Sequence, residues 1–235
     1  MGLLAAAVFF SGVASAFSVD DFETVSNPAE ALFFSFDLVG PGNSNAGDLA
    51  QLDFGLAVTV DGSQLVFEFI NNSPISSVIA QIYFDDGGEA LIGNGVVLST
   101  EVNKELSFTI GDASNGNLPG GNTIGFQANS ALTAFADSPA PKNGVGAGEN
   151  LILGYDSLVD IALVTAALAD GSLQIGFHAQ SIGASGDSDA FVSTPFVPGD
   201  GPQDPDPQNP VPEPATLVLL GMGASFLAAR KRFVG

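Results

Sequence analysis

Two acidic clusters are the residues of this sequence best suited to hold a metal ion. The first is the run Asp85-Asp86-Gly87-Gly88-Glu89, and the second is Asp187-Ser188-Asp189. Each places hard oxygen ligands on an expected turn, as Ca²⁺ sites require, although neither has the spacing of an EF-hand. The sequence leaves two interpretations open: Ca²⁺ sites formed by Asp85, Asp86, Glu89, Asp187 and Asp189, or solvated loop acids that favour solubility. No other cofactor is indicated.

Groups for covalent or acid–base catalysis are scarce. His178 is the sole histidine, Cys is absent and no G-x-S-x-G motif occurs, so the usual hydrolase constellations lack their parts. A glycosidase needs only two carboxylates, but the sequence has no Trp and only Tyr83 and Tyr155 to stack on sugar rings. We therefore predict a protein that is not an enzyme, with a secreted hydrolase as the less favoured alternative and His178 as a hydrogen-bonded residue on a strand surface.

Residues 211–235 combine a proline-bounded acid, an apolar run and a basic end. Residues 215–229 carry no charge and can form a helix in hydrocarbon, whereas Arg230, Lys231 and Arg232 cannot enter cheaply. Basic residues collect on the cytoplasmic side of bacterial spans, so the rest of the chain is predicted to lie outside. The run is shorter than the roughly 20 residues that cross a bilayer comfortably. It is predicted to be a transient anchor, with a permanent membrane anchor as the alternative.

This tail resembles the PEP-CTERM sorting tail of exported bacterial proteins. The resemblance covers Pro212, Glu213 and Pro214, the following Ala-Thr, the Gly-containing apolar run and the basic end. Each proline fixes φ and lacks an N–H, which holds Glu213 extended and exposed. The resemblance implies that a membrane-embedded exosortase recognises this triplet and removes the helix during export. It also implies a Gram-negative bacterium that makes exopolysaccharide, with matrix or biofilm association as the setting.

The N-terminal residues 1–16 read as a secretory signal peptide for the Sec machinery. An apolar core precedes Ala14-Ser15-Ala16, an A-x-A cleavage site that would leave Phe17 as the first mature residue. No Lys or Arg precedes the core, a departure that a start further upstream would explain. The alternative is a membrane anchor at this end.

The distribution of charged residues along the chain fits the predicted membrane topology. The chain has 5 basic and 26 acidic residues. Three of the basic ones are Arg230, Lys231 and Arg232 in the tail. Only Lys104 and Lys142 are therefore predicted to lie on the outer side of the membrane together with the acidic residues. Such a surface repels phosphate backbones, which excludes nucleic acid as a partner. It attracts cations, and through divalent ions an anionic exopolysaccharide. With no Cys for disulfides, the domain must be stabilised by packing.

A proline-rich stretch separates the globular part from the tail. Eight of the 14 prolines fall within residues 195–214, where extended polyproline conformation is favoured over helix or sheet. We therefore expect a globular ectodomain at 17–194, a Pro/Asp-rich linker at 195–210 and the sorting tail at 211–235.

The ectodomain is predicted to be mainly β, an antiparallel sandwich with one short helix. A hairpin is indicated at Asp61-Gly62 between two apolar segments. A helix is indicated from a capping box at Ser157 and Asp160 to Gly171, followed by a strand whose apolar face holds Leu173, Ile175, Phe177 and Ala179. The expected strands are 31–38, 52–60, 64–70, 78–84, 105–110, 123–127, 151–154 and 173–182. The 19 phenylalanines leave room for an exposed aromatic patch.

The last part of the ectodomain resembles domains that often precede PEP-CTERM tails. The shared pattern is an Ala-Leu-rich helix, Gly-x-Leu-x-Ile-Gly-x-His-x-Gln, Ile-Gly and Gly-x-Ser-Asp-x-Phe-Val, beginning here at Gly171 and ending at Val192. Such domains are mostly of unknown activity, so the resemblance implies no catalytic residue. The sequence thus predicts an exported surface or matrix protein with a structural or interaction role. The alternative is a Ca²⁺-dependent adhesive or glycan-binding module.

Overall fold

A computed structural model describes residues 21–100, 106–111 and 116–196. The chain divides into two compact units, Met1–Gly201 and Pro202–Gly235. The second unit lies outside the described residues, as do the predicted signal peptide and most of the predicted linker. The first unit holds all the elements discussed below.

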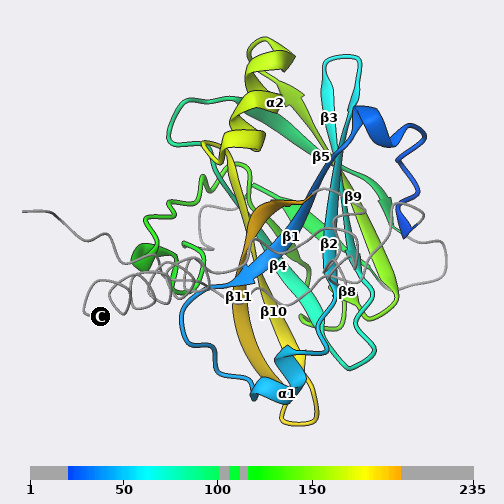
Figure 1. Ribbon diagram of the computed structural model, residues 1–235, viewed down its shortest axis with the longest axis vertical. Helices are drawn as coiled ribbons and strands as arrows, with labels where there is room; N and C mark the ends of the chain where they lie inside the picture. The colour runs from blue at the N-terminus through cyan, green and yellow to red at the C-terminus, as the bar shows by residue number, and fades with distance from the viewer. Residues whose placement is uncertain (1–20, 101–105, 112–115, 197–235) are drawn as a thin grey trace, which may run out of the picture. The chain divides into compact units, whose positions relative to one another are not determined.

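Antiparallel strands dominate the described residues (Figure 1). Two α-helices, α1 (Ala46–Leu49) and α2 (Ile161–Asp170), and a short 3₁₀ turn at Gly121–Thr123 lie between strands, and another 3₁₀ turn, Pro28–Glu30, precedes the first strand. The strands are β1 (Leu32–Leu38), β2 (Phe54–Asp61), β3 (Gln64–Asn71), β4 (Val78–Asp85), β5 (Ile92–Thr100), β6 (Phe108–Ile110), β7 (Ala134–Ala136), β8 (Val145–Gly146), β9 (Glu149–Ser157), β10 (Gln174–Ile182) and β11 (Asp187–Phe196).

The strand order places the first and last strands side by side in the middle of the sheet. The order is β5-β9-β3-β2-β1-β11-β10-β4-β7-β6, and β8 pairs with β4 off this path. The two end strands also approach each other, because a Cβ on Gly95 would lie 2.8 Å from Cγ2 of Ile110. The predicted antiparallel, mainly β fold with few helices is confirmed. Its division into the two sheets of a sandwich stays a prediction, since hydrogen bonds join the described strands into one sheet.

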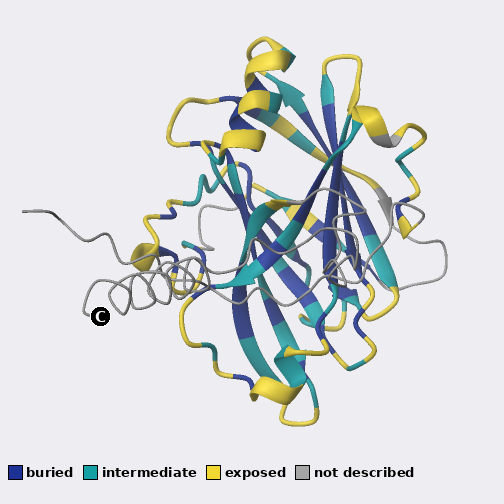
Figure 2. Cartoon of the chain, viewed as in Figure 1, coloured by how far each residue is buried: buried dark blue, intermediate teal, exposed yellow. Residues whose placement is uncertain are grey.

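Aromatic side chains fill the core. Figure 2 shows that the buried residues are concentrated along the strands. Phe177 of β10 packs against Phe36, Phe54 and Phe191, with ring centroids 4.5, 4.9 and 5.2 Å away. Such offset and edge-on contacts add to the stabilisation from burial alone. None of the exposed large apolar side chains among the described residues is aromatic. The expected exposed aromatic patch is therefore not found in that part of the chain, where phenylalanine serves the core.

Smaller apolar clusters cover parts of the other sheet face. Side chains alternate along a strand, so Phe33 and Tyr83 point away from the core that their neighbours Phe34 and Phe84 enter. Phe33 packs with Phe22 from the segment before β1. Tyr83 packs with Leu118 and Phe126 from the segment between β6 and β7. The face of the sheet that points away from the main core is therefore covered in two places by irregular chain.

The predicted hairpin and helix are confirmed, with shifted ends. Asp61 pairs with Gln64, so the turn between β2 and β3 is Gly62-Ser63, with Gly62 at φ +62°. Helix α2 is capped by Asp160, whose carboxylate accepts the N–H of Ala162, rather than by Ser157, which ends β9. Gly171 ends the helix in the left-handed conformation, at φ +82°.

Other predicted boundaries are wrong or incomplete. The expected strand at 123–127 is instead a 3₁₀ turn followed by irregular chain, with Gly125 at φ +81° and Phe126 fully buried. Strands β5, β7, β8 and β11 were not predicted. β11 runs to Phe196, two residues into the range assigned to the linker, because Pro195 and Phe196 stand opposite Phe34 and Phe33 of β1.

Candidate functional site

The first acidic cluster forms one wall of a surface pocket. Strand β4 ends at Asp85, and the chain turns through Gly87 and Gly88, both at positive φ. The N–H of Gly87 donates to Asp85 Oδ1 at 3.0 Å, and the N–H of Gly88 donates to Asp86 Oδ1 at 3.1 Å. Glycine suits both positions because it adopts the left-handed region without steric cost. The two carboxylates are thus oriented by their own turn.

The opposite wall is the segment before β7. The N–H of Gln127 donates to Asp85 Oδ2 at 2.7 Å, and Nδ2 of Asn129 donates to Asp86 Oδ2 at 3.1 Å. The N–H of Asn129 also donates to the carbonyl of Phe84 at 2.7 Å. Asp85 and Asp86 therefore tie two segments together around a pocket of about 390 Å³. Its lining residues are Asp85, Asp86, Gly87, Gly88, Gly125, Gln127, Ala128 and Asn129.

The pocket presents polar oxygens and amides rather than an assembled metal centre. Each carboxylate oxygen of Asp85 and Asp86 already accepts one hydrogen bond, and Glu89 is exposed and does not line the pocket. Within residues 21–100, 106–111 and 116–196, no group of three or more His, Cys, Asp or Glu side chains is arranged to hold a metal ion. Ca²⁺ binding at Asp85, Asp86 and Glu89 stays a prediction.

The second acidic cluster was predicted to lie on a turn. The structure instead places it at the start of β11, which begins at Asp187. Asp189 is 4% exposed, and its carboxylate accepts the N–H groups of Asn43 and Ser44. It therefore fastens the loop after β1 to the sheet, a structural task that leaves it little access to a solvent ion. The hydroxyl of Ser185 donates to the carboxylate of Asp187.

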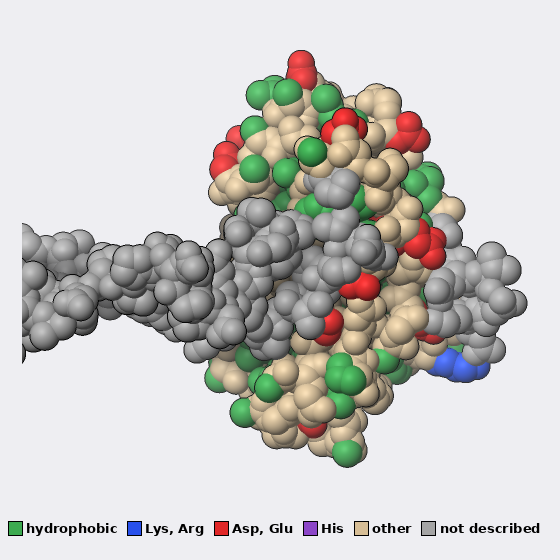
Figure 3. All heavy atoms as spheres, turned by 45° about the vertical axis from the view of Figure 1, so that its right-hand side comes forward, with side chains coloured by type: hydrophobic (Ala, Val, Ile, Leu, Met, Phe, Trp, Pro, Cys, Tyr) green, Lys and Arg blue, Asp and Glu red, His purple; other side chains and the backbone are tan. Residues whose placement is uncertain are grey.

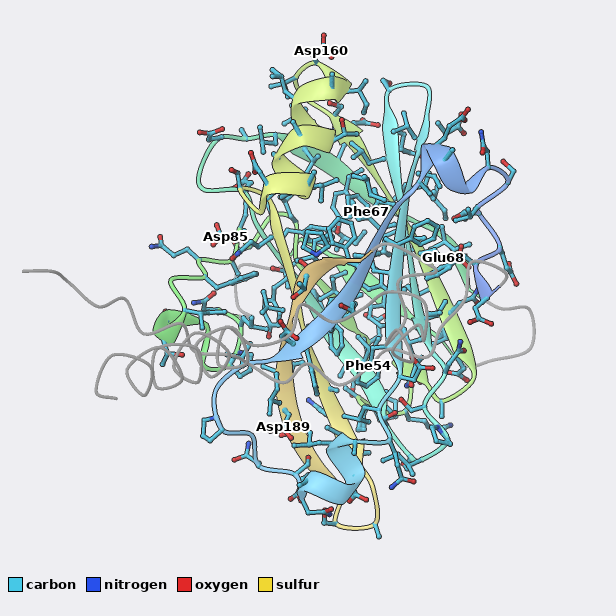
Figure 4. All side chains as sticks on the ribbon, viewed as in Figure 1. Phe54, Phe67, Glu68, Asp85, Asp160 and Asp189 are labelled. Carbon is cyan, nitrogen blue, oxygen red and sulfur yellow. The ribbon has the colours of Figure 1, made fainter. Side chains whose placement is uncertain are left out.

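The structure keeps the two acidic clusters apart. Asp85 pairs with Gln174 at the start of β10, whereas Asp187 pairs with Ile182 at its end. Figure 4 shows the labelled Asp85 and Asp189 at separate places on the domain. The two clusters cannot share one ion.

His178 lies on the polar face of β10, as predicted. The face holding Leu173, Ile175, Phe177 and Ala179 is buried, whereas His178 is half-buried on the other. Its Nδ1 lies 3.2 Å from Gln81 Oε1 and 3.4 Å from Gln180 Nε2. Burial lowers the pKa of His178, and the charge of Asp189 opposes part of that change. These amide partners hold the ring in place on the strand surface.

Sequence reasoning missed the role of Glu68 on β3. This side chain is fully buried and accepts hydrogen bonds from the N–H groups of Glu23 and Thr24, the Thr24 hydroxyl and Nδ2 of Asn150. The only signal of this role in the sequence was the loose alternation of Val66-Phe67-Glu68-Phe69. In this run the charged residue lies on the outer face of the sheet, where the chain before β1 covers it. Figure 4 labels Glu68 beside the chain that precedes β1.

The predicted processing residues lie outside the described residues. These are Ala14, Ala16 and Phe17 at the signal cleavage site, and Pro212, Glu213, Pro214, Arg230, Lys231 and Arg232 in the tail. The predicted span at 215–229 lies there too. In the part of the chain that the structure describes, no helix has the length and apolar character needed to cross a bilayer.

Comparison with known proteins identifies the tail. Residues 210–232 match the family model described as the PEP-CTERM protein-sorting motif. The predicted resemblance is therefore confirmed, and the motif implies an exported protein that an exosortase targets and that passes through a membrane-anchored stage. No curated protein and no solved structure matches the chain.

Proposed function

We propose that this chain is a non-enzymatic protein that exosortase processing delivers to the cell surface or extracellular matrix. Its β domain would have a structural or interaction role in an exopolysaccharide matrix. The observation that carries this proposal is the sorting motif at residues 210–232. The charge balance supports the proposed matrix setting. The chain has 26 acidic and 5 basic residues, and divalent cations can bridge such an acidic surface to an anionic polysaccharide.

The processing step is tested by intact-mass measurement on protein secreted by a host that has an exosortase. The wild-type chain should lose residues 1–16 and the C-terminal helix. Replacing Pro212, Glu213 and Pro214 together by Ala should leave the tail attached and the protein in the membrane fraction. Pro205→Ala, in the linker but outside the motif, is the matched control and should be processed normally. A wild-type protein that keeps its tail in such a host would contradict the proposal.

The matrix role needs a separate measurement. A deletion strain should release more polysaccharide into the medium, and the wild-type gene should restore retention. The processed protein should co-sediment with isolated matrix polysaccharide, more strongly with millimolar Ca²⁺ than with chelator. Equal recovery of the protein with and without polysaccharide would argue against this role.

A second candidate function is a Ca²⁺-dependent adhesive or glycan-binding module. The pocket at Asp85 and Asp86 favours it, because about 390 Å³ of space lined by carboxylates, amides and main chain suits a hydroxyl-rich ligand. A glycan array of the processed protein tests it, with Asp86→Asn as the pocket variant and Asp61→Asn at the exposed hairpin as the control. A melting temperature unchanged by millimolar Ca²⁺ would remove the calcium part of this candidate.

A further inference from the structure

Asn-Gly pairs occur at 94–95, 115–116 and 143–144, and the second of these includes a residue outside the described ones. Asn followed by Gly is prone to rearrange in water, because Gly has no Cβ to keep its nitrogen away from the Asn side chain. The Gly nitrogen attacks the side-chain carbonyl and displaces ammonia, which gives a five-membered succinimide. Water then opens this ring to Asp or isoaspartate. The fold decides which pairs can react.

The packing of β5 favours Asn and Gly at positions 94 and 95. Asn94 has φ +49°, a left-handed conformation that Asn adopts more readily than most residues. A Cβ at position 95 would lie 2.5 Å from Cε1 of Tyr155 on β9 and 2.8 Å from Cγ2 of Ile110 on β6. Only Gly fits there without a shift of its neighbours. The close approach of three strands therefore selects a reactive pair at this point.

Asn94 is also accessible to water. Its side chain is exposed, and Asn94 and Gly95 lie in a register irregularity of β5, where the pairing with β9 is interrupted between Gly93 and Val96. Residues outside a regular ladder have more freedom to bring a side chain onto the next nitrogen. Asn94 Nδ2 donates to Asp156 Oδ2 at 3.1 Å in an exposed hydrogen bond, for which water can compete. Both partners of the reaction can therefore meet.

The pair at 143–144 is held in a way that opposes the same reaction. Asn143 Nδ2 donates to the carbonyl oxygens of Asp137 and Ser138 at 3.2 and 3.3 Å. The N–H of Gly144, which would be the nucleophile, donates to the carbonyl of Pro141 at 2.8 Å, and Gly144 is buried. Val follows both pairs, so their local sequences match closely. The chain thus contains its own reference for the effect of the fold.

We propose that Asn94 is a site of spontaneous modification, at which the folded chain converts its amide to a carboxylate. One water is consumed and one ammonia is released, so no enzyme and no oxidant is required. Hydroxide removes the amide proton of Gly95 as the new C–N bond forms and ammonia leaves. The Gly95 nitrogen regains a proton when water opens the ring.

The new carboxylate should loosen this part of β5. It replaces the hydrogen bond to Asp156 with repulsion between like charges. Few cations can offset it, because Lys142 is the sole Lys or Arg within residues 21–100, 106–111 and 116–196. Figure 3 shows Asp and Glu side chains at several places on the described surface and Lys or Arg at one. In the proposed matrix setting, the copies that persist longest would carry the most converted Asn94.

Peptide mapping of the secreted protein tests the reaction. The folded protein is incubated at mildly alkaline pH and cleaved after Glu and Lys, which releases Asn94 within residues 90–101 and Asn143 within residues 143–149. The Asn94 peptide should gain about 1 Da as Asp and isoaspartate forms. It should do so about ten times faster than the Asn143 peptide, and faster still as the pH rises. In urea the two rates should become similar, because the fold no longer separates them.

Three variants test the site and its consequence. Asn94→Gln keeps an amide but needs a larger ring to react, so it should gain no mass at this position. Asn94→Asp should lower the melting temperature by about 2–4 °C. Adding Asp156→Asn should restore most of this loss, because the opposing charge is gone.

An unmodified Asn94, or equal conversion of Asn94 and Asn143 in the folded protein, would overturn the proposal. A loss of melting temperature that Asp156→Asn does not restore would overturn the charge-based consequence.

Discussion

Glu68 and Thr24 form a clamp between β3 and the chain that precedes β1. Both the N–H and the hydroxyl of Thr24 donate to Glu68 Oε2 at 2.8 Å. The other carboxylate oxygen accepts from Glu23 N–H at 2.8 Å and Asn150 Nδ2 at 3.1 Å. Four donors from the described residues therefore satisfy this fully buried carboxylate. The clamp fixes the chain a few residues after the predicted signal cleavage site, and Phe22 packs beside it on Phe33.

Replacing Glu68 by Gln should destabilise the protein. The amide nitrogen of Gln would face donors that now meet Oε2, leaving them unsatisfied and buried. We expect a loss of about 1–3 kcal/mol in the free energy of unfolding, measured in urea. Glu23→Gln is the control, because that side chain is exposed and the main-chain N–H that binds Glu68 is kept. Equal stability of Glu68→Gln and wild type would show that the clamp contributes nothing.

His178 should make the protein less stable as the pH falls from 7.5 to 5.5. Burial lowers its pKa in the folded protein below the ordinary value of 6.5. The unfolded chain therefore takes up a proton at a pH where the folded chain does not, and stability present above 6.5 is lost below it. His178→Gln should flatten this part of the curve. NMR titration of the only imidazole in the chain should give a pKa under 6.5; a higher value would contradict the assignment.

The two tyrosines should resist ionisation until the protein unfolds. Burial raises the pKa of Tyr83 to about 12 and raises the pKa of Tyr155 still further. Their hydroxyls donate to Gln81 Oε1 at 2.8 Å and to the carbonyl of Leu132 at 2.6 Å. An unfolded tyrosine ionises near pH 10, so stability should fall as the pH rises above 10. Absorbance at about 295 nm should therefore rise together with loss of the circular dichroism signal. If the tyrosines ionised while the circular dichroism signal was still unchanged, the burial of Tyr83 and Tyr155 would be contradicted.

Gly176→Ala should destabilise the protein through a clash with Leu118. A Cβ at position 176 would lie 2.7 Å from Cδ2 of Leu118 and 3.1 Å from the carbonyl oxygen of Phe191. We expect a cost of about 1–3 kcal/mol in the free energy of unfolding, as for other overpacked sites. The double variant with Leu118→Ala should recover part of this cost because the space is then open. Strictly additive effects of the two substitutions would show that the residues do not interact.

Alternation and turn chemistry in the sequence were enough to predict the mainly β fold. They locate β2, β3, β4 and β10, because each has a continuous apolar face bounded by residues that favour turns. They miss β5 because Gly93, Asn94 and Gly95 read as a loop, whereas pairing with β9 holds this segment extended. They place a strand at 123–127 because the spacing of apolar residues there suits one. In the structure those residues instead cover the outer face of the sheet.

The candidate site was only partly predictable. The run from Asp85 to Glu89 indicates a polar turn, but nothing local shows that Gln127 and Asn129 complete a pocket with it. Asp189 looks like a loop acid because Gly186 and Ser188 flank it, yet its carboxylate accepts N–H groups from residues 145 and 146 positions away in the sequence. Contacts over such separations are set by strand order, which a single sequence does not reveal. The sorting motif was recognisable because its features are contiguous.

The pairing of β1 with β11 constrains when the domain can fold. Leu38 stands opposite Phe191 and Phe33 opposite Phe196, so the middle of the sheet closes only after the last strand has arrived. During export from N- to C-terminus, a chain stalled before residue 187 would have an open seam with the edges of β1 and β10 exposed. β11, the last segment needed for folding, ends at Phe196, before the sorting motif at residues 210–232, so the seam closes only when the chain has been exported almost to its tail.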